Sequence, residues 1–80
     1  MSRFSQHRLN EEADYFEREA RRSDAAALDG DQAAKDANLN GYNQGVASRC
    51  AVIARSNARE YRNIAASLRH GEIPDGLQLD

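Results

Sequence analysis

Apolar side chains recur with the period of an α-helix between residues 42 and 70. At about 100° per residue, positions spaced three or four apart fall within one sector of such a helix. This large-residue stripe consists of Tyr42, Val46, Cys50, Ile53, Asn57, Tyr61, Ile64 and Leu68. Several members are eleven residues apart, and an eleven-residue repeat keeps a stripe nearly parallel to the helix axis. The pattern predicts a long, straight packing surface.

A second stripe, made of alanines, continues the same apolar sector. Its members are Ala47, Ala51, Ala54, Ala58 and Ala65. Alanine also occurs in helices for propensity alone, but here the alanines are grouped, so we favour close approach of another helix. Because the two stripes together are wider than one neighbouring helix usually covers, the sequence predicts association of two copies.

The first part of the chain carries a narrower apolar line, which a single neighbour can cover. Its members are Leu9, Ala13, Phe16, Ala20 and Ala27, with Ser23 in the gap. Leu28 to Asp31 is the clearest break, because Gly30 can end one helix and Asp31 can begin the next. We therefore predict a single all-α domain over residues 1–80, an antiparallel hairpin of helices at about 5–28 and 31–70 that forms a helical-bundle homodimer.

The segment 38–45 leaves two alternatives, since its three asparagines and two glycines weaken a helix. Either a turn here produces a third helix, or one long helix passes through with a bend. We favour the continuous helix, because Leu39, Tyr42 and Val46 keep a helical phase. The second helix is expected to end at His70, with Gly71 after its cap and Pro74 beyond. Residues 1–6 and 72–80 are predicted to be frayed, with Leu77 and Leu79 either along the bundle or disordered.

Two sets of residues are candidates for intermolecular contact. The large-residue stripe is the candidate dimer and core interface, and Asn57 within it is typical of a polar seam residue that pairs with its own copy; the alternative places Asn57 at the wet margin. The candidate partner-binding residues are Arg55, Arg59, Arg62, Arg69 and Tyr15. The arginines form either a solvated face or a surface for an acidic partner.

Composition narrows the classes of function. The 80 residues carry a net charge of −2, which is unlike the strongly basic footprint of a dedicated nucleic-acid binder. The single cysteine, Cys50, excludes an intramolecular disulfide and is expected to be buried as a small hydrophobe. The sequence has neither a signal-like apolar segment nor a membrane-length apolar run, so we expect a cytoplasmic protein without membrane contact.

No motif indicates catalysis. The two histidines lie near opposite ends of the chain, without metal-ligand spacing, and Gly41 and Gly45 belong to no phosphate-binding loop. We expect no enzyme activity, no cofactor and no metal. The predicted function is a small protein–protein interaction module, an inhibitor or accessory protein of phage or mobile-element type that occludes a larger host protein or complex. The alternatives are a nucleic-acid-binding regulator that uses the arginine face and a structural or adaptor subunit.

Overall fold

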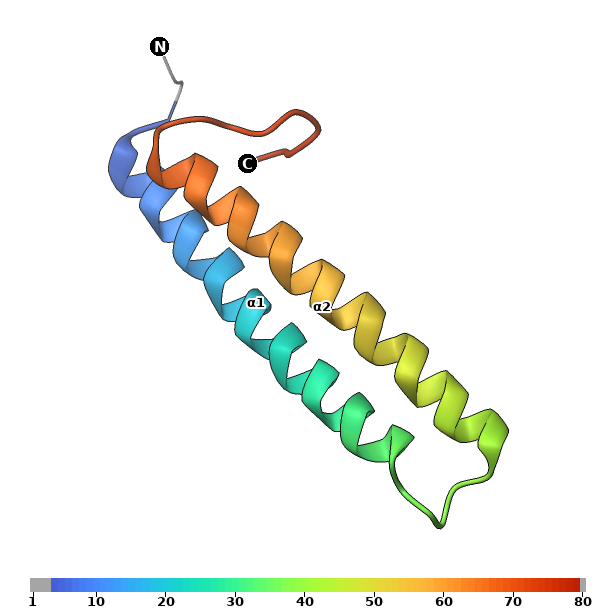
Figure 1. The fold of residues 1–80 in the computed structure, drawn as a ribbon. Helices are drawn as coiled ribbons and strands as arrows, with labels where there is room; N and C mark the ends of the chain where they lie inside the picture. The colour runs from blue at the N-terminus through green and yellow to red at the C-terminus, as the bar shows by residue number, and fades with distance from the viewer. Residues whose placement is uncertain (1–3, 80) are drawn as a thin grey trace.

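The structure, a computed structural model, describes residues 4–79 and is an antiparallel helical hairpin. Helix α1 spans Gln6–Ala34 and helix α2 spans Gly41–Arg69. The two helices pack side by side along their whole length in a rod of 54 × 18 × 18 Å, with the connection at one end and both chain termini at the other (Figure 1). The predicted all-α hairpin is confirmed. Residues 1–3 and 80 of the predicted frayed ends lie outside the described residues.

The connection between the helices lies at residues 35–40, so the predicted turn at Gly30 and the continuous helix through 38–45 are both wrong. Polar side chains that bond to nearby backbone build this turn. The Asp36 carboxylate accepts from the Asn38 backbone N–H at 2.9 Å. Asn40 caps α2, its Oδ1 accepting from the Asn43 backbone N–H at 2.7 Å. The break expected near 38–45 is thus the hairpin turn itself and does not create a third helix.

Gly30 is helical and marks a close approach of the two helices. A Cβ atom placed on Gly30 would lie 2.9 Å from the Ala47 carbonyl oxygen and 3.0 Å from the Ala51 Cβ. One glycine inside a helix costs only about 1 kcal/mol relative to alanine. Because its side of α1 touches the backbone of α2, the missing side chain serves packing and does not end the helix.

The buried interface consists largely of alanines that recur every seven residues on both helices. The buried side chains are Leu9, Ala13, Ala20 and Ala27 of α1 with Ala51, Ala58, Ala65 and Leu68 of α2. The α1 line is the one predicted, and the alanine stripe of α2 provides the close approach predicted for it. The eleven-residue repeat does not describe this contact, because the residues facing α1 follow a seven-residue repeat instead.

The large-residue stripe of α2 is therefore divided by the fold. Leu68 is fully buried in the hairpin core, and the Tyr61 ring lies 6.1 Å from the Phe16 ring. The other members lie beside the contact with α1. Tyr42 and Ile53 are 76% and 60% exposed, and Asn57 and Cys50 are exposed as well, so the expected burial of Cys50 does not occur within one chain. Small side chains occupy the contact between the helices because they let the two backbones approach more closely than large side chains would.

The C-terminal segment folds back over the end of the hairpin that holds both termini (Figure 1). Helix α2 ends as predicted, with Gly71 at a φ of 81° and a Glu72 N–H bond to the Ser67 carbonyl at 2.9 Å. Gln6 of α1 donates to the Leu68 carbonyl at 3.1 Å. Ile73, Leu77 and Leu79 are partly buried against the cluster of Leu9, Ala13, Ala65 and Leu68. Of the two alternatives for Leu77 and Leu79, the structure therefore has the one along the bundle.

The close approach at Gly30 predicts opposite effects for two Gly→Ala substitutions. Gly45→Ala gains helix propensity in open surroundings, 3.6 Å from the flexible Arg49 guanidinium, and should raise the free energy of unfolding by roughly 0.5–1 kcal/mol. Gly30→Ala gains the same helix propensity but overpacks the contact between the helices, and should lower the free energy of unfolding by about 1–2 kcal/mol. Urea denaturation followed by circular dichroism measures both. Equal stabilisation by the two variants would contradict the close contact.

Candidate interaction surfaces

One side of the hairpin carries a row of ion pairs between the helices, which we call the ladder side. Arg55, Arg62 and Arg69 of α2 are seven residues apart, as are Asp31, Asp24 and Glu17 of α1. Arg55 pairs with Asp31 and Arg62 with Asp24. Arg69 donates from Nε to Glu17 at 2.8 Å and from Nη2 to Asp14 at 2.6 Å. A spacing of seven keeps each set on one edge of its helix, so all three pairs form in a single register.

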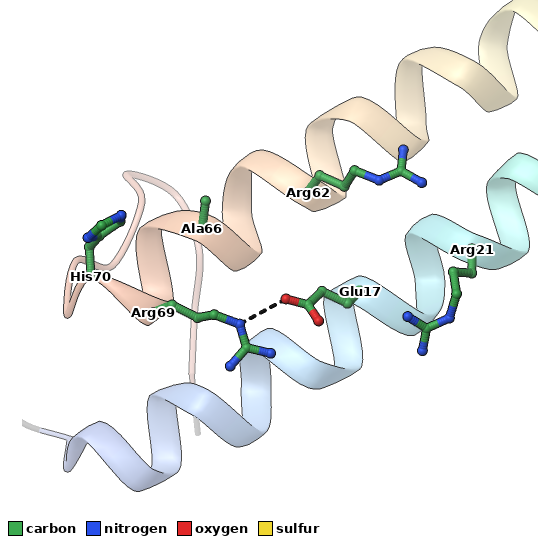
Figure 2. A pocket seen from close by; sticks show the side chains of 6 residues that line it. All are labelled: Glu17, Arg21, Arg62, Ala66, Arg69 and His70. Carbon is green, nitrogen blue, oxygen red and sulfur yellow. Dashed lines mark hydrogen bonds and ion pairs between the residues drawn. The ribbon is translucent and has the colours of Figure 1, made fainter.

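The pairing follows from the direction of side chains on antiparallel helices. A helical side chain leans toward the N-terminus of its own helix. Arg62 and Arg69 accordingly extend from α2 toward the hairpin turn (Figure 2). The acids of α1 lean the opposite way, so the two sets reach toward each other. The ladder is thus a consequence of heptad spacing combined with an antiparallel arrangement.

The ladder perturbs the electrostatics of one carboxylate. The hydrogen bond from the Arg69 guanidinium, aided by its positive charge, lowers the pKa of Glu17 below its usual value of 4.5 against a smaller opposing effect of burial. The Arg69 and Glu17 side chains are each more than a third exposed, and exposed ion pairs contribute little net stability. We conclude that the ladder selects the register of the helices more than it holds them together.

The predicted arginine face is therefore largely occupied within the hairpin. Arg55, Arg62 and Arg69 bind acids of α1, whereas Arg59 has no ion-pair partner in residues 4–79. An open hollow lies on the ladder side near the chain ends, and the residues lining it are Glu17, Arg21, Arg62, Ala66, Arg69 and His70 (Figure 2). Because two of its arginines already bind carboxylates, the hollow is a weak candidate for phosphate or another anion. The sequence signal for this ladder is the seven-residue spacing of two sets of opposite charges.

On the side of the hairpin opposite the ladder, α2 presents apolar residues that are partly or largely exposed, and we call this the apolar side. On α2 it is formed by Val46, Cys50, Ile53, Asn57 and Ile64. Cys50, Asn57 and Ile64 each precede a buried alanine, which places them about 100° around the helix from it, away from the arginines. On α1 the matching positions, just before Ala13, Ala20, Ala27 and Ala34, are Glu12, Glu19, Ala26 and Ala33. The α1 part of this side is therefore apolar toward the hairpin turn and charged toward the chain ends, where Glu12 and Glu19 pair with Arg8 and Arg22. This side thus carries most of the predicted large-residue stripe.

Adjacent residues of α2 fall on different sides of the rod. Val52 and Ile53 are 61% and 60% exposed, but Val52 lies toward the ladder side and Ile53 on the apolar side. Tyr15, the partner-binding candidate of α1, is 46% exposed and packs edge-on to Phe16 with ring centroids 5.3 Å apart. Tyr15 and the four arginines do not form one surface, because the arginines follow the ladder side or the outer face of α2.

Within residues 4–79, no three His, Cys, Asp or Glu side chains gather as metal ligands would. Neither α1 nor α2 combines the length and apolar character that a membrane crossing requires. The chain matches no protein-family model, and neither the curated proteins nor the solved structures include a significant match. The two sides of the hairpin are thus its candidate functional features.

The lowered pKa of Glu17 predicts a specific acid sensitivity. Near neutral pH the ionised carboxylate stabilises the fold, and this stability is lost as pH falls from about 4.5 through the lowered pKa, because the unfolded chain takes up its proton first. Glu17→Gln should therefore flatten the decline of the unfolding free energy below pH 5. Denaturation of the wild type and of Glu17→Gln at a series of pH values tests this. An unchanged slope in Glu17→Gln would exclude the effect.

Proposed function

We propose that the chain is a small non-enzymatic interaction module that acts as a homodimer and occludes part of a larger protein. The observation that carries this proposal is the apolar side of α2, where Ile53 is 60% exposed and Cys50 is exposed beside it. Contiguous exposed apolar surface is typical of a protein–protein contact. The fold supports the same conclusion, since two helices in one layer create no enclosed cleft for a reaction.

The size of the exposed surface supports a homodimer. The hairpin exposes 5773 Å², whereas a compact monomer of 8.9 kDa exposes about 4,800 Å². The excess of roughly 1,000 Å² is comparable to the ~800 Å² that each partner buries in a standard interface. A second hairpin on the apolar side would supply the missing layer and complete a four-helix bundle.

The proposed mode of action is occlusion of a host protein or complex by an accessory protein of phage or mobile-element type. A small helical rod can act on a larger protein by covering part of its surface. The alternative of a nucleic-acid regulator loses support, because Arg55, Arg62 and Arg69 are neutralised by acids of α1. Arg59, by contrast, keeps its charge available for a partner.

The homodimer predicts different outcomes for two neighbouring substitutions of equal exposure. Ile53→Asp places an unpaired carboxylate in the dimer contact and should raise the dimer dissociation constant at least about 30-fold, the scale of an interface hot spot. Val52→Asp, on the ladder side, should change the dimer dissociation constant by less than about threefold. Sedimentation equilibrium measures both constants. A wild-type chain that is monomeric at 100 μM, or equal effects of the two variants, would contradict the homodimer on this side.

Partner capture tests the occluding role. Tagged wild-type chain in a bacterial lysate should retain a specific larger protein, identified by mass spectrometry. Arg59→Glu should reduce this retention at least about fivefold by reversing a charge that has no pair within the hairpin. Arg18→Glu, a matched exposed arginine of α1, should not. If no protein is retained above the level of an unrelated helical bait, the occluding role is wrong.

A further inference from the structure

We infer that a second copy of this chain docks on the apolar side with its α2 antiparallel to α2, so that Arg49 of each copy pairs with Glu60 of the other. This inference rests on the proposed homodimer and specifies its surface and orientation. Two observations carry it: the unsatisfied charges that border the apolar side, and their spacing along the helix.

Two charges of α2 that lie away from the ladder side, Arg49 and Glu60, lack an ion pair within residues 4–79, as Arg59 does toward the ladder side. Both Arg49 and Glu60 are exposed. Glu60 is also the single acidic residue of α2. Neither residue has an opposite charge three or four positions away on its own helix, where such pairs form. Both side chains are therefore available for an ion pair with another chain.

The spacing of the two residues suits a two-fold arrangement. They are eleven residues apart, which is almost a whole number of helical turns, so they lie on one line along α2 about 16 Å apart. Ile53 lies between them near that line, and Asn57 lies to one side of it. An antiparallel copy reverses the line, which brings Arg49 opposite Glu60 at both ends. A parallel copy would instead place Arg49 against Arg49 and Glu60 against Glu60, and like charges at an interface cost free energy.

A two-fold axis near the midpoint between Arg49 and Glu60 also brings the apolar residues of the two copies together. With the two-fold axis between Ala54 and Arg55, which exchanges Arg49 and Glu60, Val46 of one copy comes within one residue of Ile64 of the other, and Ile53 comes within one residue of Asn57. These four side chains are the larger uncharged ones on the apolar side of α2. Their contact covers the exposed surface of Ile53, while the two ion pairs close its ends. Such a self-complementary surface is the requirement for an isologous dimer.

Charge reversal tests the arrangement. Arg49→Glu and Glu60→Arg should each raise the dimer dissociation constant at least tenfold, because each creates two like-charge contacts per dimer. The double variant Arg49→Glu/Glu60→Arg restores both pairs and should return the constant to within threefold of wild type. Arg59→Glu, a reversal next to Glu60 but off the line, should leave it unchanged. Sedimentation equilibrium gives these constants, and circular dichroism verifies that each variant is helical.

Mixing provides an internal control for folding. Chains carrying Arg49→Glu alone and Glu60→Arg alone should form a heterodimer when combined, although each is mostly monomeric by itself. A dimeric wild type whose double variant is not restored, or whose single variants dimerise normally, would overturn the antiparallel arrangement and leave the homodimer standing. A monomeric wild type would overturn the homodimer and this inference together.

Discussion

The structure depends on contact between two faces of small side chains. Ala13, Ala20 and Ala27 of α1 meet Ala51, Ala58 and Ala65 of α2, all of them buried. An alanine buries little apolar area, so the hydrophobic stabilisation per residue is small. Alanines stabilise the hairpin mainly by letting the two backbones approach closely, because close backbones make many dispersion contacts along the length of the rod. The larger apolar side chains Leu9 and Leu68 are fully buried only at the end near the termini, where Ile73, Leu77 and Leu79 cover them.

A repeating alanine face leaves the register of the helices ambiguous, since a slip of seven residues places alanine on alanine again. Three features remove the ambiguity. The ladder loses an ion pair at each slip, Gly30 would no longer meet the backbone at Ala47, and Leu68 would leave the pocket that the C-terminal segment closes. The charges thus act mainly as specificity devices in an otherwise repetitive interface, as charged flanks do in coiled coils.

Much of the fold follows from the sequence. Helical periodicity predicts the all-α hairpin, the line from Leu9 to Ala27 predicts the buried face of α1, and Gly71 predicts the end of α2. The turn could not be placed by single residues, because glycine both ends helices and permits close crossings, and only the position of α2 shows which role Gly30 has. The sequence also does not show which face of α2 packs on α1. Hydrophobicity alone would bury Ile53 before Ala54, whereas the close approach of the two backbones favours the smaller alanine in the contact.

The division of the α2 stripes has a functional consequence. Had Ile53 and Val46 faced α1, the hairpin would have satisfied itself and offered only polar surface. Because the alanines occupy that contact, the larger side chains of α2 are displaced onto an outer side without the ladder. In the proposed dimer a second copy covers them, and Arg49 and Glu60, which are of opposite sign and form no ion pair within residues 4–79, meet on either side of the two-fold axis. The proposed arrangement therefore satisfies the apolar side and these two charges at once.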